Sequence, residues 1–229
     1  MKPKVTVLTT VYNGERFIME TIKSVLNQTF EDFEYIIVDD GSTDNTANII
    51  KSFKDKRIKY YYRGKNEGYF KLQRAINFGL KKAKGKYIAR IDADDLCCPE
   101  RLQIQFDFLE SNQDIFLIGS SVNIIDKDGN IINTILKKEY PSMLLKLRIA
   151  ISNPIIHSSI MFRNKGLEYP WHNEHFFYFN VLINGYQIKN MKEILTEYRI
   201  NPNGLMKQYA DLSKNKYKEL YLEWKNLQL

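Results

Sequence analysis

Apolar runs alternate with amphipathic segments through the first half of the chain. The runs at residues 5–11, 33–38, 58–62 and 87–91 are rich in β-branched and aromatic residues, which is typical of buried strands. Between these runs, apolar residues recur at helical spacing, at Ile18, Ile22, Val25 and Leu26, at Ile49, Ile50 and Phe53, and at Leu72, Ala75, Ile76, Leu80 and Ala83. The alternation predicts an α/β fold with a mostly parallel sheet and helices on both faces.

The second half has a weaker pattern. Pro99 is expected near the start of a helix that carries Leu102, Phe106 and Leu109, and residues 115–118 read as a strand. The Asp128-Gly129 pair between residues 122–126 and 131–135 predicts a β-hairpin. Residues 205–224 predict a helix with a basic, aromatic face, which either packs on the main domain or lies on a membrane surface.

Polar residues follow each strand of the first half. They are Thr10, Tyr12 and Asn13, then Asp39 and Asp40, then Asn66 and Gly68, and last Asp92, Asp94 and Asp95. Because parallel strands end at the same edge of a sheet, these residues are expected to converge on one crevice. There Tyr12 could stack on a base, and Asp39 could accept hydrogen bonds from a uracil imide or a ribose hydroxyl. Asp94, with a neighbouring acid, could hold a hard divalent cation that binds a diphosphate, although a solvated acidic turn is the alternative.

Composition narrows the classes of partner. The 229 residues include 44% hydrophobic residues and carry a formal charge of +7, which suits one sizeable core. The charge suggests a nucleotide, a nucleic acid or an acidic membrane, or only a soluble lysine-rich surface. No glycine-rich phosphate loop is present. Two adjacent cysteines, no signal peptide and no apolar run of about 20 residues lead us to expect a cytoplasmic protein, with contact at the cytoplasmic face of a membrane as an option.

Several longer sequence segments contain or adjoin the polar residues that follow the predicted strands. They are Thr10-Val-Tyr-Asn-Gly-Glu15, Ser24-Val-Leu-Asn-Gln-Thr29, Ile37-Val-Asp-Asp-Gly-Ser-Thr-Asp44, Asn66-Glu-Gly68, Ala83-Lys-Gly-Lys-Tyr-Ile-Ala-Arg-Ile-Asp-Ala-Asp-Asp95 and Pro99-Glu-Arg-Leu102. In order and spacing they resemble the inverting family-2 glycosyltransferases of GT-A fold, whose first half is a Rossmann-like nucleotide-binding unit. The resemblance implies transfer of a sugar from a nucleotide-diphosphate donor, often UDP-linked, to a hydroxyl acceptor on a glycan, a lipid-linked glycan or a protein.

The resemblance also implies roles for individual residues. Mn²⁺ or Mg²⁺ is the implied cofactor, with Asp94 and His157 as candidate ligands, although His157 could equally be a structural residue. Asp39 resembles the acid that reads the base, and Asp92 the acid near the ribose. The implied donor-binding set is Thr10, Tyr12, Asn13, Glu15, Asp39, Asp40, Asn66, Gly68, Arg74, Asp92, Ala93 and Arg199.

The catalytic base is where the sequence departs from the family pattern. Family members commonly carry Glu-Asp at the start of a late helix, and here Glu174 is followed by His175. Either His175 is the base, or Glu174 acts from a shifted position, or activity is weak. The structural alternative is that both residues begin a helix and have no catalytic role.

The sequence predicts one domain and leaves two rival functions open. We expect one GT-A domain over residues 1–200, divided into a nucleotide-sugar half (1–95) and an acceptor-side half (96–200), followed by a helical tail (201–229). One rival is a nucleotide-sugar-binding protein that is catalytically weak. The other is a nucleic-acid-binding module, which only the basic charge favours; without a basic and aromatic recognition motif, no nucleic-acid partner is expected.

Overall fold

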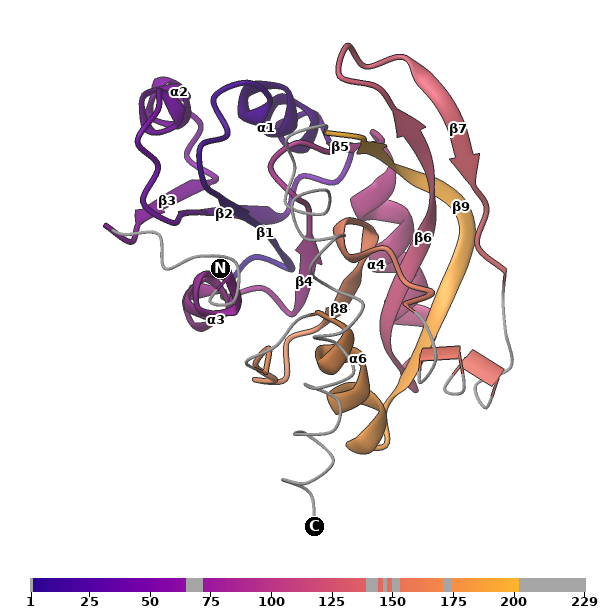
Figure 1. Cartoon of the computed structure of the whole chain (residues 1–229). Coiled ribbons are helices and arrows are strands. Elements are labelled where there is room, and N and C mark those ends of the chain that lie inside the picture. Colours follow the sequence, from indigo (N-terminus) through magenta and orange to yellow (C-terminus); the bar gives the residue numbers. More distant parts are fainter. Residues whose placement is uncertain are drawn as a thin grey trace, which may run out of the picture. The chain divides into compact units, whose positions relative to one another are not determined.

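The computed structural model describes residues 2–64, 72–138, 144–145, 148–149, 153–170 and 174–201. Residues up to Arg199 form one compact unit around a mixed β-sheet (Figure 1). Residues 200–229 form a second unit, of which only Ile200 and Asn201 are described. The predicted helical tail therefore lies outside the described residues, and the predicted domain division stays a prediction.

The first half of the chain builds the parallel part of the sheet. Its strands lie in the order β3 (Ile58–Tyr62), β2 (Phe33–Asp39), β1 (Val5–Val11) and β4 (Tyr87–Arg90). Every residue of β1 and β2 is buried, which explains why both strands consist mainly of β-branched, aliphatic and aromatic residues. In the register of these two strands Val11 pairs with Asp39, so the loops after β1 and β2 leave the sheet side by side.

The second half adds strands of mixed direction. They are β5 (Leu96–Cys97), β6 (Ile115–Ile125), β7 (Ile131–Ile135), β8 (Met161–Arg163) and β9 (Gln187–Arg199). Strand β8 joins β4 to β6 through antiparallel pairs on both sides, and β9 runs parallel to β6. The predicted β6–β7 hairpin is confirmed. Strand β6 continues past the predicted end at residue 118, because it pairs with β9 through several register shifts as far as Arg199.

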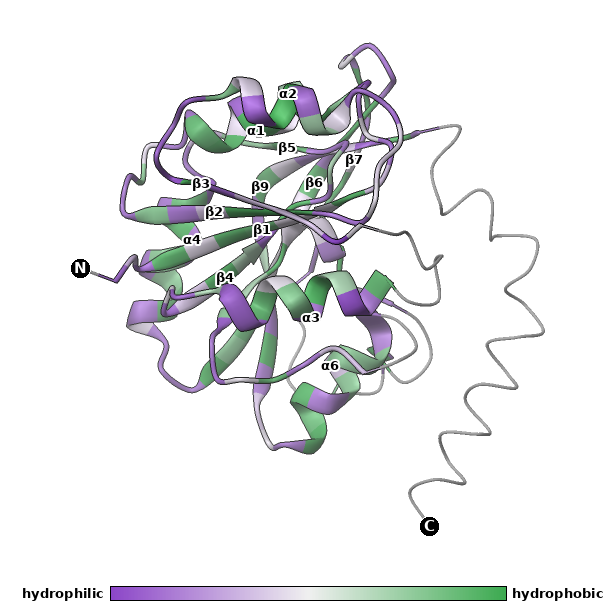
Figure 2. Ribbon diagram, turned by 90° about the vertical axis from the view of Figure 1, so that its left-hand side faces the viewer, coloured by the Kyte–Doolittle hydropathy of each residue, from purple (hydrophilic) through white to green (hydrophobic). Residues whose placement is uncertain are grey.

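Helices cover both faces of the sheet, as predicted (Figure 2). On one face α1 (Ile18–Leu26), α2 (Thr46–Ser52) and α4 (Arg101–Ser111) pack against one set of alternating strand residues, which includes Val7. On the other face α3 (Leu72–Lys82) and α6 (Glu174–Ile183) pack against the complementary set, which includes Leu8. Successive strand residues point to opposite faces, so each strand contributes to both cores.

Two observations bear on the environment of the protein. Among the described residues, none of the helices combines the length and the apolar character needed to cross a bilayer. Cys97 and Cys98 are both free thiols, and Cys97 is buried.

Candidate functional site

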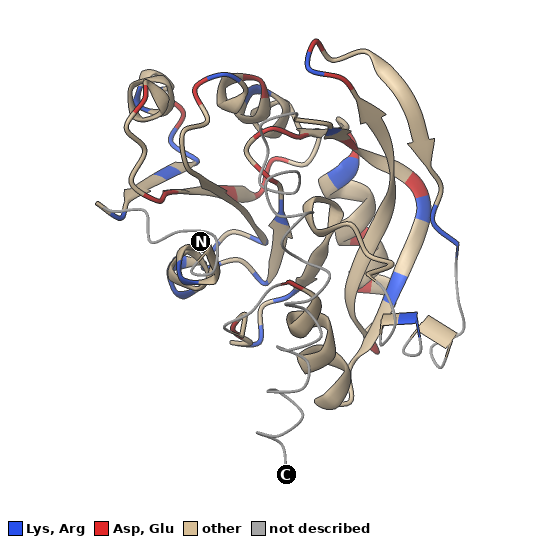
Figure 3. Ribbon diagram, viewed as in Figure 1, with Lys and Arg blue, Asp and Glu red and all other residues tan. Residues whose placement is uncertain are grey.

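Residues 92–95, which we call the acidic loop, come just after β4, and hydrogen bonds to their backbone groups hold them in place. Figure 3 shows the acidic residues of the protein in red. The Asp92 N–H donates to Ser158 Oγ at 2.9 Å, and the Asp95 N–H donates to the Asp92 carbonyl at 3.3 Å. From α1, the Thr21 hydroxyl donates to the Ala93 carbonyl at 2.9 Å. The acidic loop is thus held by one internal hydrogen bond and by two bonds to other segments, one to Ser158 and one to α1.

The acidic loop concentrates negative charge. Asp95 is 1% exposed, and its burial, followed by the charges of Asp94 and Asp92, raises its pKa well above the ordinary value. The Asp92 side chain is 37% exposed and Asp94 is half-buried, so their hard oxygen atoms lie nearer the surface. In the described part of the chain no three acidic, histidine or cysteine side chains converge as a complete metal cage. Asp92 and Asp94 supply carboxylate oxygen atoms, which are the hard ligands that Mg²⁺ and Mn²⁺ take, so the chemistry of these two side chains fits such a cation.

A buried arginine orients Asp92. Arg90 is 1% exposed, donates through Nη1 to the Leu8 carbonyl at 2.6 Å and through Nη2 to Asp92 Oδ1 at 2.8 Å. This guanidinium offsets part of the negative charge of the acidic loop and fixes one carboxylate oxygen of Asp92. Our sequence interpretation missed Arg90, although a charged residue inside the apolar run 87–91 was a signal.

His157 lies beside Asp92 rather than in open solvent. Its Nδ1 is 3.9 Å from Asp92 Oδ1, and its Nε2 is hydrogen-bonded to Tyr169 Oη at 2.9 Å. Burial, with a smaller effect of Arg90, lowers the pKa of His157 to about 3, so the ring is neutral at neutral pH. Both ring nitrogens face protein groups, which gives His157 a structural position; its predicted role as a metal ligand stays a prediction.

The two candidate bases have different surroundings. Burial, and then the charge of Asp92, raises the pKa of Glu174, so this carboxyl group lies within electrostatic reach of the acidic loop. The His175 ring lies 5.2 Å from the Phe179 ring, centroid to centroid, and hydrogen-bonds the Ile149 carbonyl. Burial lowers the pKa of His175. Glu174 therefore shares the environment of Asp92, and the described contacts of His175 lie elsewhere.

The loop after β1 is locked to the loop after β2. Asn13 has a φ of 51°, a left-handed conformation that asparagine tolerates better than most residues. Its N–H donates to Ser42 Oγ at 2.9 Å, and its Oδ1 accepts from the Thr43 N–H at 2.8 Å. Glu15 accepts from the Asn45 N–H at 2.9 Å. Asn13 and Glu15, both expected to bind the donor, thus shape the loops of the site.

Tyr12 and Thr10 differ in exposure at the end of β1. Tyr12 is 48% exposed and available for the expected stacking, whereas Thr10 is 8% exposed.

The two acids after β2 are buried. Asp39 is 0% exposed; its Oδ1 accepts from the Ser42 N–H and its Oδ2 from Tyr60 Oη, each at 2.8 Å. Asp40 is 2% exposed and pairs with Arg63 Nη1 at 2.7 Å. A nucleotide base could therefore reach Asp39 only after a local shift of the Ser42 turn or of Tyr60.

The remaining predicted residues are dispersed. Arg74 is half-buried in the first turn of α3. Asn66 and Gly68 lie outside the described residues. The Arg199 side chain is 0% exposed, and its Nε donates to the Asp94 carbonyl at 2.8 Å. The guanidinium of Arg199 thus presents no surface to a diphosphate and contacts the acidic loop from inside the protein.

Tyr198 precedes Arg199 at the end of β9. Burial raises the pKa of its phenol, and the charges of Asp95, Asp92, Asp94 and Glu174 raise it further. The phenol therefore interacts electrostatically with the acidic loop and with Glu174, and its hydroxyl group is of a kind that can hydrogen-bond anionic oxygen atoms.

Comparisons with known proteins show the family to which the chain belongs. The family described as "Glycosyl transferase family 2" matches residues 6–211. An uncharacterized glycosyltransferase of Methanocaldococcus jannaschii is 34% identical, over 98% of this chain and 81% of the relative. A UDP-Glc:α-D-GlcNAc-diphosphoundecaprenol β-1,3-glucosyltransferase of Escherichia coli is 31% identical, over 94% of this chain and 82% of the relative.

A solved structure shows the same fold. The mannosyltransferase PcManGT of Pyrobaculum calidifontis, in complex with GDP-Man and Mn²⁺, superposes with a TM-score of 0.69 at 16% identity. The match covers 96% of this chain and 65% of that protein, so this chain spans less than two thirds of its length. The α/β architecture described above is therefore the GT-A fold, as predicted.

Proposed function

The chain belongs to glycosyl transferase family 2, and we propose that it moves a sugar from a UDP-linked donor to a hydroxyl group with inversion at the anomeric carbon. The acceptor hydroxyl belongs to a glycan, a lipid-linked glycan or a protein. One observation supports the proposal: the charge of Asp92 contributes to the raised pKa of Glu174, so the two carboxyl groups are electrostatically coupled. The proposal assigns diphosphate binding to the acidic loop and proton acceptance to Glu174. The choice of UDP follows the donor of the Escherichia coli relative, UDP-Glc, and that relative also favours a role in polysaccharide biosynthesis.

Asp94 and Asp92 are the residues that would hold Mn²⁺ or Mg²⁺. Their partial exposure supports this, as does the concentration of three carboxyl groups in the acidic loop, where burial first, and then the charges of Asp94 and Asp92, raise the pKa of Asp95. The Mn²⁺ in the Pyrobaculum calidifontis enzyme supports the same assignment. A bound cation would supply Lewis-acid stabilisation of the departing diphosphate.

Glu174 is the proposed base. The acceptor oxygen attacks the anomeric carbon, its proton passes to a Glu174 oxygen, and the bond from that carbon to the diphosphate oxygen breaks with its electron pair leaving on UDP. The raised pKa of Glu174 supports this role, because a carboxylate with a higher pKa is a stronger base. Asp92, oriented by Arg90, lies on the donor side of the same site.

The test measures UDP or GDP release from UDP-Glc and GDP-Man, with and without Mn²⁺, by the wild-type protein and two variants. Glu174→Gln should lower kcat at least about 100-fold, because it removes a general base, while the donor Kd changes little. His175→Gln is the matched control on the next residue and should stay within about threefold, because its described contacts are with Ile149 and Phe179.

Two results would contradict parts of the proposal. A large loss of kcat in His175→Gln with a fully active Glu174→Gln would reassign the base to His175. Wild-type protein that binds UDP with Mn²⁺ but releases no nucleotide and transfers no sugar would favour the rival function, a catalytically weak nucleotide-sugar-binding protein.

A further inference from the structure

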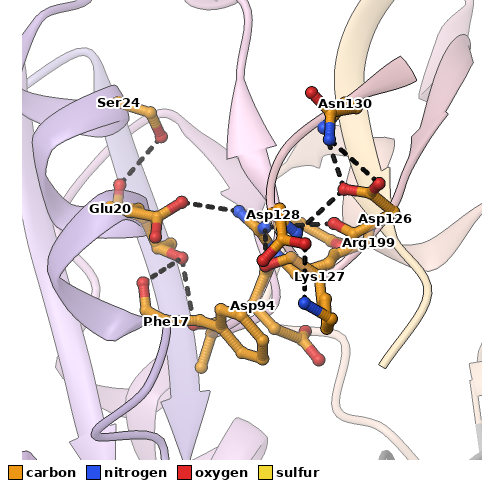
Figure 4. Close-up of polar contacts among 12 residues, drawn as sticks. Phe17, Glu20, Ser24, Asp94, Asp126, Lys127, Asp128, Asn130 and Arg199 are labelled. Carbon is orange, nitrogen blue, oxygen red and sulfur yellow. Dashed lines mark hydrogen bonds and ion pairs between the residues drawn. The ribbon is translucent and has the colours of Figure 1, made fainter. Parts of the chain in front are cut away.

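Arg199 is the last residue of β9, and its buried guanidinium joins four separate segments of the chain (Figure 4). Nε donates to the Asp94 carbonyl at 2.8 Å, and Nη2 donates to Glu20 Oε2 of α1 at 2.7 Å. Nη1 donates to the carbonyl groups of Asp126 and Lys127 at 3.2 and 3.1 Å. Every nitrogen of the guanidinium is therefore engaged.

The backbone of Arg199 makes a second contact with the acidic loop. Its N–H donates to Asp95 Oδ1 at 2.7 Å. Together with the bond from Nε, this contact fixes Asp94 by its carbonyl and Asp95 by its carboxylate. The Arg199 side chain also stacks on Phe17, with Cζ 4.6 Å from the ring centroid, which limits its freedom to leave. Arg199 thus holds the C-terminal part of the acidic loop at two successive residues.

The anchors of Arg199 are themselves rigid. Asp126 closes the β6–β7 turn, because its Oδ1 accepts from the N–H groups of Asp128 and Asn130 at 2.8 and 2.9 Å. On the other side, the hydroxyl group of Thr21, the residue that follows Glu20 in α1, donates to the Ala93 carbonyl. The acidic loop is therefore clamped between α1 and the β6–β7 turn, with Arg199 as the link between them.

We propose that Arg199 is a positioning residue that sets the orientation of Asp94 for cation binding, and that it does not contact the diphosphate itself. This inference rests on the proposed function, in which Asp94 is a ligand of Mn²⁺ or Mg²⁺. The physical basis is that hydrogen bonds to the segment that carries a metal ligand orient the ligand's carboxylate. They thereby determine how well its oxygen atoms can coordinate the cation. Lysine cannot replace Arg199, because its three N–H donors share one nitrogen, whereas the acceptors around Arg199 are spread over the three nitrogens of a planar guanidinium.

The matched control is Arg163, another buried arginine with a similar set of bonds. It donates to the carbonyl groups of Ile115, Leu109 and Asn112 and to Tyr87 Oη. Arg163 is the last residue of β8 and pairs with Tyr87, the first residue of β4, so it lies at the opposite end of β4 from the acidic loop. Arg163→Lys removes a comparable amount of buried hydrogen bonding without touching residues 92–95. Loss of general stability will therefore affect Arg163→Lys and Arg199→Lys alike.

The experiment titrates Mn²⁺ into the full chain with saturating UDP and follows free Mn²⁺ by its electron paramagnetic resonance signal. We expect the Mn²⁺ Kd to rise at least about 10-fold in Arg199→Lys and to stay within about twofold of wild type in Arg163→Lys. Glu20→Gln, whose side chain is 52% exposed in the wild type, keeps the fold and should raise the Mn²⁺ Kd by about two- to fivefold.

A second titration without metal compares UDP with UMP, which lacks the second phosphate. We expect the ratio of their Kd values to be the same in Arg199→Lys and wild type. A fall in UDP affinity alone, with Mn²⁺ binding unchanged, would overturn the inference in favour of direct phosphate contact. If Arg199→Lys does not fold, an unchanged Mn²⁺ Kd in Glu20→Gln would also overturn it. Wild-type protein that binds no Mn²⁺ with UDP would instead refute the metal part of the proposed function.

Discussion

The neutral state of His157 leads to a quantitative prediction for stability. In the fold its pKa is lowered to about 3, whereas an unfolded histidine titrates near about 6.5. As the pH falls below about 6.5, only the unfolded chain takes up this proton, so the contribution of His157 is complete above that pH and is lost towards pH 3. Between about pH 7.5 and about pH 5.5 the loss in the free energy of unfolding is about 1.4 kcal/mol.

The measurement is urea unfolding of wild type and His157→Asn at these two pH values. Other groups titrate alike in both proteins. From the higher to the lower pH, the free energy of unfolding of the wild type should therefore fall by about 1 kcal/mol more than that of the variant, after allowance for the 14% exposure of the ring. Tyr169→Phe is the control: it removes the partner of Nε2 without changing a titration in this range, and should lower stability equally at both pH values. An equal pH dependence in wild type and His157→Asn would refute the argument that His157 is neutral in the fold.

Three further predictions concern activity and packing. Because burial raises the pKa of Glu174, kcat/KM for sugar transfer should fall with decreasing pH around a midpoint above the ordinary carboxyl value of about 4.3, and a midpoint below that value would contradict the assigned base. A glycine-to-alanine change normally stabilises a helix. Gly79→Ala should instead lower the free energy of unfolding by about 1–3 kcal/mol in urea titrations, because the added Cβ would collide with Leu8. A gain in stability would refute the close packing of α3 on β1. Thr21→Val should raise the Mn²⁺ Kd several-fold by freeing the Ala93 carbonyl, and an unchanged Kd would show that this bond is dispensable.

Much of the nucleotide half was predictable from local pattern. The runs that became β1, β2 and β4 are largely apolar because both faces of these strands are covered, whereas β3 at the edge of the sheet is partly exposed. The helical spacing between the runs matches α1 and α3. Parallel strands end at one edge, so the position of the acidic loop next to the loops after β1 and β2 followed from strand order. The second half was harder, since the direction and length of β6, β8 and β9 depend on pairing between segments distant in sequence.

The sequence by itself determined the α/β order, the acidic loop at the end of β4 and the pair Glu174-His175 as the candidates for the base. Only the tertiary structure decided which groups surround these residues. Neighbours on a helix point about 100° apart, so the packing of α6 determines that Glu174, and not His175, shares the environment of Asp92. Burial likewise turned Arg199 from an expected phosphate ligand into an internal support of the acidic loop, because desolvation and hydrogen-bond partners are properties of the folded chain.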